Sequence, residues 1–236
     1  MCTVIVHVPN HAGDPVRLLA VRDEDPGRQW DALAESWPDE HPGVVGVRDR
    51  RAGGAWLAAD PAAGRVAVIL NRADQIPDDG APLDSRGHVV LEAIAGRSPS
   101  GAPRTHGFNL VEADAAGARV IMWDGAGIRR VDLQPGIHMI AHDDVDDATT
   151  ARIVAWRGAF AEPGDGERWW EPWLDTLERT AEVGPVDDRA IVRDNRPFGY
   201  PTLSLLACAA SIDASGAAVV YGEFDRPGEW NRLTLS

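Results

Sequence analysis

The stretch MCTVIVHV (residues 1–8) places a cysteine directly behind the first methionine, followed by several β-branched residues. β-Branched side chains favour extended backbone, so this stretch predicts a strand that begins almost at the first residue. Cys2 then has three interpretations: a chance occurrence, a strand end packed into a core, or a nucleophile whose own α-amino group is the base. Residues elsewhere in the chain have to distinguish them.

Further strands are expected along most of the chain. The segment RLLAVRDE (residues 17–24) follows the turn HAGDP, and with the first strand it predicts a hairpin. Short β-rich segments separated by glycine and proline recur later. They predict strands within residues 43–71, 108–143 and 202–224.

Helices are expected at Ser85–Ala95, from near Asp146 onward, and over residues 169–183, where apolar residues recur at helical spacing. The polar stretch of residues 26–42 is expected to be a loop with a helical turn. Hairpin-connected strands interrupted by helices indicate an α+β layered fold. We find no internal repeat or obvious linker, which favours one domain over residues 1–236.

Composition restricts the partners. The chain has 37 acidic and 23 basic residues, a net charge of −14, and every basic residue is arginine. An acidic surface repels phosphate backbones and anionic lipids, so we expect neither nucleic-acid nor membrane-surface binding. No apolar stretch approaches the roughly 20 residues of a membrane helix, and no signal peptide is visible. Cys2 and Cys208 form no zinc pattern, so we expect a cytoplasmic protein without a metal and with a small-molecule partner.

Two local clusters each allow two interpretations. HDDVDD (residues 142–147) is typical either of a metal site or of a solvated helix start, since aspartate is favoured at the positive end of a helix dipole. WWEPW (residues 169–173) indicates either a carbohydrate or partner surface, or rings that pack an amphipathic helix onto a sheet. Cys208, within LLACAAS, has the pattern of a small core residue.

Six short motifs occur in a fixed order over about the first 145 residues. They are Cys2, LLAVRDE (residues 18–24), RRAGGAWLAAD (50–60), VAVILN (66–71), HGFNLVEAD (106–114) and LQPGIHMIAH (133–142). Together they resemble the NRDE-motif family, also called the transport-and-Golgi-organisation family, which is similar to the cysteine Ntn hydrolases.

The resemblance implies an Ntn-hydrolase-like four-layer αββα sandwich of two antiparallel sheets. It also implies that Met1 is lost and that Cys2 is the nucleophile, with its free amine as proton shuttle. An α-amino group has a pKa of about 7.7–8.0, which suits that task. Arg22 would hold the thiolate and Asp23 would orient the amine or Arg22.

Further roles follow from the same resemblance. Asn71 would complete an oxyanion site. Gly53 and Gly54 would let backbone approach closely beneath the site, and Trp56 would pack the sheet interior. From the residues alone, Arg22 and Asp23 are equally typical of a surface ion pair, and Asn71 of a turn.

Three positions depart from the family pattern. Val21 stands in place of the first asparagine of the NRDE string. Ala141-His142 replaces a Ser-Asn pair, and His142 could donate instead of the lost amide. Pro201 occupies the position of an arginine in a C-terminal string, and Arg196 is a nearby candidate substitute.

Two functions therefore remain open at the level of sequence. The first is a Cys2-dependent amidohydrolase or acyltransferase that acts on a small amide or acyl substrate without a cofactor. The second is a carrier or homeostasis protein that binds haem or lipid/acyl-CoA as cargo in the same cleft. Cys2, His7, His138 and His142 are candidate axial ligands for haem by residue type.

Overall fold

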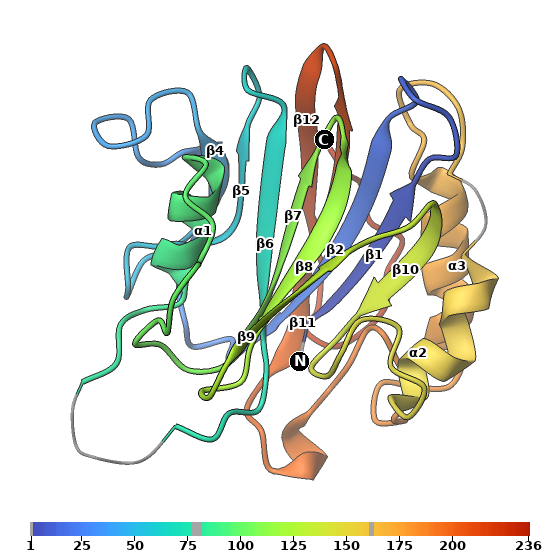
Figure 1. Cartoon of the computed structure of the whole chain (residues 1–236). Coiled ribbons are helices and arrows are strands. Elements are labelled where there is room, and N and C mark those ends of the chain that lie inside the picture. Colours follow the sequence, from blue (N-terminus) through green and yellow to red (C-terminus); the bar gives the residue numbers. More distant parts are fainter. Residues whose placement is uncertain (1, 77–81, 161–162) are drawn as a thin grey trace.

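The fold is two antiparallel sheets that face each other, as the computed structural model of residues 2–76, 82–160 and 163–236 describes (Figure 1). The five-stranded sheet has the order β10 (Gly136–Ile140), β1 (Thr3–Val8), β2 (Val16–Glu24), β11 (Leu203–Asp213), β12 (Gly216–Glu223). The seven-stranded sheet has the order β3 (Trp30–Glu35), β4 (Val45–Asp49), β5 (Ala55–Asp60), β6 (Arg65–Asn71), β7 (Phe108–Asp114), β8 (Gly117–Trp123), β9 (Ile128–Asp132). The predicted α+β sandwich of two antiparallel sheets is confirmed.

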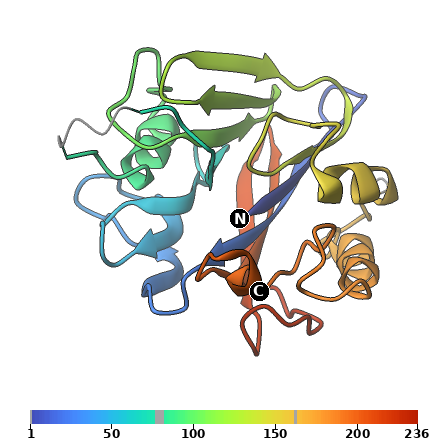
Figure 2. The same ribbon diagram turned by 90° about the horizontal axis from the view of Figure 1, so that it is seen from below.

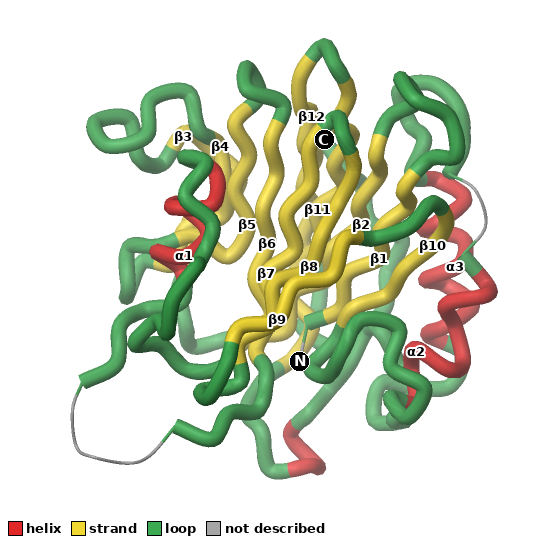
Figure 3. The backbone as a smooth tube through the Cα atoms, viewed as in Figure 1, coloured by secondary structure: helices red, strands yellow, loops and turns green. Residues whose placement is uncertain are grey.

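Helices cover the outer face of each sheet (Figure 3). Helix α1 (Gly87–Ile94) packs on β5 and β6 of the seven-stranded sheet. Helices α2 (Ala151–Trp156) and α3 (Glu171–Ala181) lie on the outer side of the five-stranded sheet. The short 3-10 helix η1 (Arg157–Ala159) follows α2 directly, and η2 (Arg196–Phe198) lies below the two sheets in the view of Figure 1. Seen from below, α1 lies on one side of the molecule and α2 and α3 on the other (Figure 2). The layers are therefore helix, sheet, sheet, helix.

The side chains of β1 alternate between two hydrophobic cores, so this strand is buried on both faces. Val4 and Val6 belong to the core between the two sheets, whereas Ile5 belongs to the core between the five-stranded sheet and its helices. Successive side chains of a strand point to opposite faces, so both cores draw on one strand. A run with no polar alternation, TVIVHV, is the expected pattern for a strand covered on both sides.

One secondary-structure prediction was wrong. The sequence predicts a loop with a helical turn over residues 26–42, but β3 occupies Trp30–Glu35 at the edge of the seven-stranded sheet. WDALAE lacks β-branched residues, and its pairing with β4 shifts register between Asp31 and Ala34. Pairing with a neighbouring strand, which local propensity does not encode, makes this segment extended.

The WWEPW cluster packs a helix, as one of its two interpretations predicts. Trp169, Trp170 and Trp173 are all buried in the core beneath α3. The rings of Trp169 and Trp173 meet edge to face, with centroids 5.4 Å apart. Such pairs stabilise by about 0.5–1.5 kcal/mol beyond their buried area.

The HDDVDD segment joins β10 to α2 through hydrogen bonds and ion pairs. Asp147 Oδ1 accepts hydrogen bonds from the backbone N–H groups of Thr149 and Thr150, just before α2 begins. Asp144 pairs with Arg72 and Arg129, and the hydrogen bond from Arg129 lowers its pKa to about 2. These contacts agree with a helix start. None of the helices within the described ranges is long and apolar enough to cross a membrane.

A contact between His138 of β10 and Asp146 holds the same segment against β10. His138 Nδ1 lies 2.7 Å from Asp146 Oδ2, and His138 Nε2 lies 2.7 Å from the carbonyl of Gln134. Both neighbours are hydrogen-bond acceptors, so this arrangement favours the doubly protonated, cationic ring. The hydrogen bond to Asp146 raises the pKa of His138, and Arg157 pairs with the same carboxylate at 3.0 Å.

Replacing His138 with glutamine tests this ion pair. Because the pKa of His138 is raised above its unfolded value of about 6.5, its contribution is complete below about pH 6.5 and is lost as pH rises through the folded-state pKa. We expect the wild-type free energy of unfolding to fall by about 1–2 kcal/mol across that rise, and H138Q to lose most of this slope. Urea denaturation at about pH 6 and about pH 9 measures both.

His106 provides the matched control, because it contacts Asp74 at 3.1 Å but has 63% of its side chain exposed. H106Q should keep the wild-type slope. An H138Q protein with an unchanged slope would contradict the cationic assignment.

Substitution of Gly54, just before β5, tests the close backbone contact between β5 and the start of α1. A Cβ on Gly54 would lie 2.5 Å from the carbonyl carbon of Gly87 at the start of α1. We expect G54A to lower the free energy of unfolding by about 1–3 kcal/mol, because backbone cannot move aside cheaply. Thermal melting measures the loss. G101A, where a Cβ meets nothing within 4 Å, should change stability by under about 0.5 kcal/mol, and equal effects at both sites would refute the contact.

Candidate active site

Cys2 lies at the head of β1, beside β2. The antiparallel register pairs Thr3 with Val21 and so continues to Cys2 opposite Arg22. Cys2 Sγ accepts a hydrogen bond from the backbone N–H of Asp23 at 3.4 Å and donates to the carbonyl of Asp23 at 3.6 Å. Main-chain groups of β2 therefore fix the sulfur, and its position follows from strand pairing.

The Cys2 thiol is buried, with 8% of the residue exposed. Burial and the nearby Asp23 carboxylate raise the pKa of this thiol. A raised pKa keeps the sulfur protonated at neutral pH, so activation requires a further positive charge close to it. Met1, whose loss the nucleophile hypothesis requires, lies outside the described residues.

Arg22 is buried between aromatic rings, with 3% of its side chain exposed. Its guanidinium carbon lies 5.7 Å from the ring centroid of Trp30 and 5.9 Å from that of Trp56. Its Nη2 donates to Glu24 at 3.4 Å, and its buried Nη1 has no hydrogen-bond partner among the described residues. A buried donor without a partner costs about 1–3 kcal/mol of stability, so Nη1 is the unsatisfied group of this guanidinium among the described residues.

Asp23 is held by a buried polar network from the last third of the chain. Ser204 Oγ donates to Asp23 Oδ1 at 2.5 Å, and Asn195 Nδ2 donates to Asp23 Oδ2 at 3.2 Å. Arg193 supports both partners: its backbone N–H donates to Ser204 Oγ and its Nε donates to Asn195 Oδ1. The carboxylate therefore has a fixed orientation.

A pocket of about 510 Å³ opens beside Cys2. Its described lining joins β1, β2, the strands β5 and β6, and the start of α1. The lining is strongly charged, with four arginines and four carboxylates among the described residues: Arg22, Arg28, Arg51, Arg86, Asp23, Glu24, Asp49 and Asp84.

Four of the five site residues predicted from the sequence line this one pocket: Cys2, Arg22, Asp23 and Asn71. Asn71 ends β6 with an exposed side chain. Trp56 also lines the pocket and reaches the core between the sheets, as expected.

His142 does not line that pocket. Its Nε2 contacts Asp143 at 3.2 Å, and its buried Nδ1 has no partner among the described residues. Burial, followed by the charge of Arg152, lowers the pKa of His142. Asn109 holds the backbone around His142 instead, donating to the carbonyls of Ala141 and Asp143 at 3.0 and 2.7 Å.

The structure shows where the residues that depart from the family pattern lie relative to the pocket. Val21 is buried in the core beneath the outer helices, on the opposite face of β2 from Cys2, so no polar group is lost from the pocket there. Arg196 is exposed and pairs with Asp194, so it does not replace the arginine expected at Pro201. Arg193 is the buried arginine of this region.

Sequence reasoning predicted two of the eight charged residues in the described lining and missed six: Glu24, Arg28, Asp49, Arg51, Asp84 and Arg86. Arg86 precedes α1 and donates through Nη1 to the carbonyl of Gly107 at 3.0 Å. Arg28 donates to Asp49 at 2.5 Å and, although burial opposes it, this hydrogen bond lowers the pKa of Asp49. The residues lie in a turn and at element ends, where the sequence carries no periodic signal.

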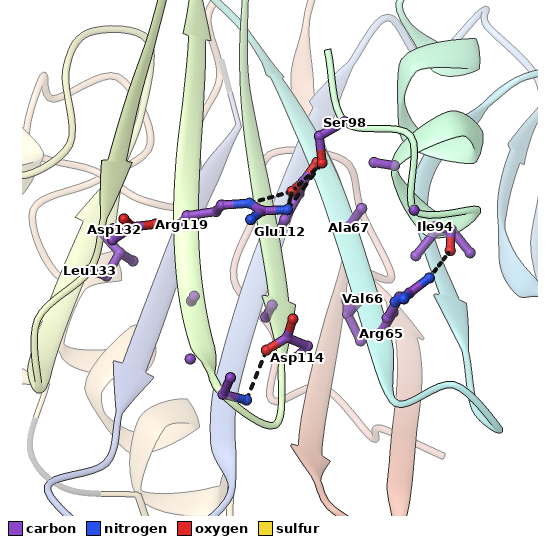
Figure 4. A pocket seen from close by; sticks show the side chains of 16 residues that line it. Arg65, Val66, Ala67, Ile94, Ser98, Glu112, Asp114, Arg119, Asp132 and Leu133 are labelled. Atoms are coloured by element: carbon purple, nitrogen blue, oxygen red, sulfur yellow. Dashed lines mark hydrogen bonds and ion pairs between the residues drawn. The ribbon is translucent and has the colours of Figure 1, made fainter. Parts of the chain in front are cut away.

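A second cavity, of about 340 Å³, lies on the outer face of the seven-stranded sheet near the end of α1 (Figure 4). Glu112 is central to it and accepts hydrogen bonds from Arg119 Nε at 2.6 Å and Ser98 Oγ at 2.9 Å. No cysteine or histidine is among its described lining residues. Of these two pockets, only the one beside Cys2 has a thiol among its described lining residues.

Comparison with known families identifies the chain from its first 162 residues. The model of the family described as Transport and Golgi organisation 2 matches residues 1–162, which hold Cys2, the Arg22–Asp23 pair and Asn71. No curated protein matches the chain. The matched region covers more than half of the sequence, and the chain belongs to the Transport and Golgi organisation 2 family.

Proposed function

We propose that this protein is an amidase that cleaves a small amide through Cys2 after Met1 has been removed. The observation that carries the proposal is the position of Cys2 Sγ, which lines the 510 Å³ pocket while the main chain of Asp23 fixes it. A nucleophile held by backbone needs little reorganisation at the moment of attack. Arg22, opposite Cys2 in the strand register, supplies a fixed positive charge.

The reaction follows from the groups present. Loss of Met1 frees the α-amino group of Cys2, whose ordinary pKa of about 7.7–8.0 leaves part of it neutral near pH 7 and able to accept a proton, and the ammonium that forms on that transfer stabilises the thiolate. The amine takes the thiol proton, and the sulfur attacks the carbonyl carbon of the amide. The C–N bond then breaks, and the leaving amine receives that proton. Water, deprotonated by the same α-amine, hydrolyses the thioester, so that amide and water give a carboxylic acid and an amine.

Asn71 and Arg22 are the proposed partners of the developing oxyanion. Asn71 lies at the pocket wall with its side chain exposed, and Arg22 Nη1 lacks a partner among the described residues. Asp23, fixed by Ser204 and Asn195, is proposed to orient the freed amine. His142 lies outside the pocket lining, so this proposal gives it no catalytic role.

The charged lining favours this function over the carrier alternative. A haem or lipid site is mostly apolar, whereas eight charged residues line this pocket among those described. His138, one of the candidate axial ligands, has both ring nitrogens engaged by Asp146 and Gln134. A small polar amide matches these surroundings better than a macrocycle or an acyl chain.

The test compares two cysteine variants. C2A should abolish hydrolysis of a library of small amides by more than about 10³-fold, because it removes the nucleophile. C208A should retain it, since Cys208 is fully buried in β11 and burial raises the pKa of its thiol. Amine release measures turnover, and intact-mass spectrometry measures Met1 removal and the thioester.

Iodoacetamide labelling checks the reactivity directly. Cys2 should be alkylated much faster than Cys208 in the processed protein. Retained Met1, or equal and slow labelling of both thiols, would contradict the amidase and favour the carrier, which titration with haem at the Soret band would then examine.

A further inference from the structure

We propose that Trp30 is a positioning residue of the site, which holds the guanidinium of Arg22 near Cys2 by linking the edge strands of the two sheets. This inference rests on the proposed function for what Arg22 does in a reaction. The hold itself is measurable on the Cys2 thiol without turnover.

Hydrogen bonds alone hold the guanidinium of Arg22 weakly. Its Nη2 donates to Glu24 at 3.4 Å, a long contact for charged partners, and its Nη1 has no partner among the described residues. Glu24 is also shared, since its Oε2 lies 3.9 Å from Arg28 Nε. A long, flexible side chain with one such contact needs packing to keep its charge in one place.

Two indole rings supply that packing. The guanidinium carbon of Arg22 lies 5.7 Å from the ring centroid of Trp30 and 5.9 Å from that of Trp56. Both distances are within the range of about 6 Å in which a ring face attracts a cation. A ring attracts the guanidinium without adding a negative charge, so it fixes the position of the cation and leaves its charge intact.

Strand register explains why a residue of the edge strand β3 reaches Arg22. Arg22 pairs with Leu206 of β11, and Leu206 pairs with Glu223 of β12, so these three residues lie in one row. Leu206 belongs to the core between the sheets, and directly paired residues share a face, so the row faces the seven-stranded sheet. The edge strands β3 and β12 contact each other on this side of the sandwich.

Tyr221 of β12 fixes the ring of Trp30 between these two edge strands. Trp30 Nε1 donates to Tyr221 Oη at 2.9 Å, and Tyr221 Oη donates to Glu223 at 2.6 Å. An indole whose N–H is bonded in this way has a set orientation. Trp56 is buried in the core between the sheets, whereas Trp30 is only half-buried. The position of the Trp30 ring therefore depends on its link to Tyr221.

The Cys2 thiol reports where the charge of Arg22 lies. Burial and then Asp23 raise the pKa of this thiol, whereas the positive charge of Arg22 lowers it. The titratable and charged groups around Cys2 are its own α-amine after processing, Arg22 and Asp23 on β2, Arg86 before α1, Arg152 on α2, and His142 just beyond β10. Of these groups, Arg22 has the cation–π contact with Trp30, so a change at Trp30 reaches the thiol through Arg22.

Titration of Cys2 in Trp30 variants tests this hold. In a C208A background Cys2 is the one cysteine of the chain, so the ¹³C chemical shift of its Cβ reports this thiol. We expect W30L to raise the pH midpoint of the titration by about 0.5–1 unit, because the guanidinium is no longer held near the thiol. W30F and Y221F, which each break the Trp30–Tyr221 hydrogen bond but keep a ring beside Arg22, should raise it by about half as much. W156L is the matched control, since Trp156 of α2 also donates its indole N–H to one acceptor, the carbonyl of Arg189.

A double-mutant cycle with Arg22 shows whether Trp30 acts through it. W30L should add less than about 0.2 unit to the midpoint in an R22Q background. An unchanged midpoint in W30L, an equal shift with and without Arg22, or a shift of the same size in W156L would overturn the inference. Circular dichroism establishes that each variant is folded, and W30F and Y221F keep the test decisive if W30L is not.

Turnover separates this inference from the proposed function. On the amide library, W30L should lower kcat at pH 7 by at least about fivefold and change KM by less than about threefold, since Arg22 acts on the thiol and the developing oxyanion. A shifted midpoint in W30L without hydrolysis by the wild type would refute the amidase and leave the role of Trp30 intact. Hydrolysis by the wild type with an unshifted midpoint in W30L would refute the role of Trp30 alone.

Discussion

The pairing of β1 with β2 is the constraint on which the rest of the structure depends. Its register, with Thr3 opposite Val21, places the Cys2 sulfur against the main chain of Asp23. The same register sends Val4 and Ile5 into two different cores, so a shift by one residue would bury the wrong faces and move the sulfur. Stability and the position of the candidate nucleophile are therefore consequences of one pairing.

A buried polar network links this pairing to the distant end of the chain. Ser204 and Asn195 bind the Asp23 carboxylate, and Arg193 binds both of them. Such a network stabilises little in net terms, but losing one member leaves the others unsatisfied in a low dielectric. The orientation of Asp23 in β2 therefore depends on Ser204 of β11. That strand lies outside residues 1–162, which the family model matches.

The sandwich could be predicted from the sequence because its strands carry strong local signals. TVIVHV and VAVILN are extended by propensity, and the turns between them contain glycine or proline. Edge strand β3 could not be predicted, because WDALAE becomes a strand only through pairing with β4. Motif order brought four site residues to one pocket, whereas Arg86 depends on a helix–sheet contact at Gly54 and Gly87 that no local pattern encodes.

Two of the three departures from the family pattern can be placed relative to Cys2. Val21 faces the outer core, whereas His142, although outside the pocket lining, lies opposite Cys2 when the β1–β10 register is continued by two residues. What limits the thiol is its surroundings: burial and Asp23 both raise its pKa. A positive charge created at Cys2 itself acts at the shortest distance and opposes both effects. Under the proposed function, processing at Met1 is therefore the step that would separate a reactive cysteine from an inert one.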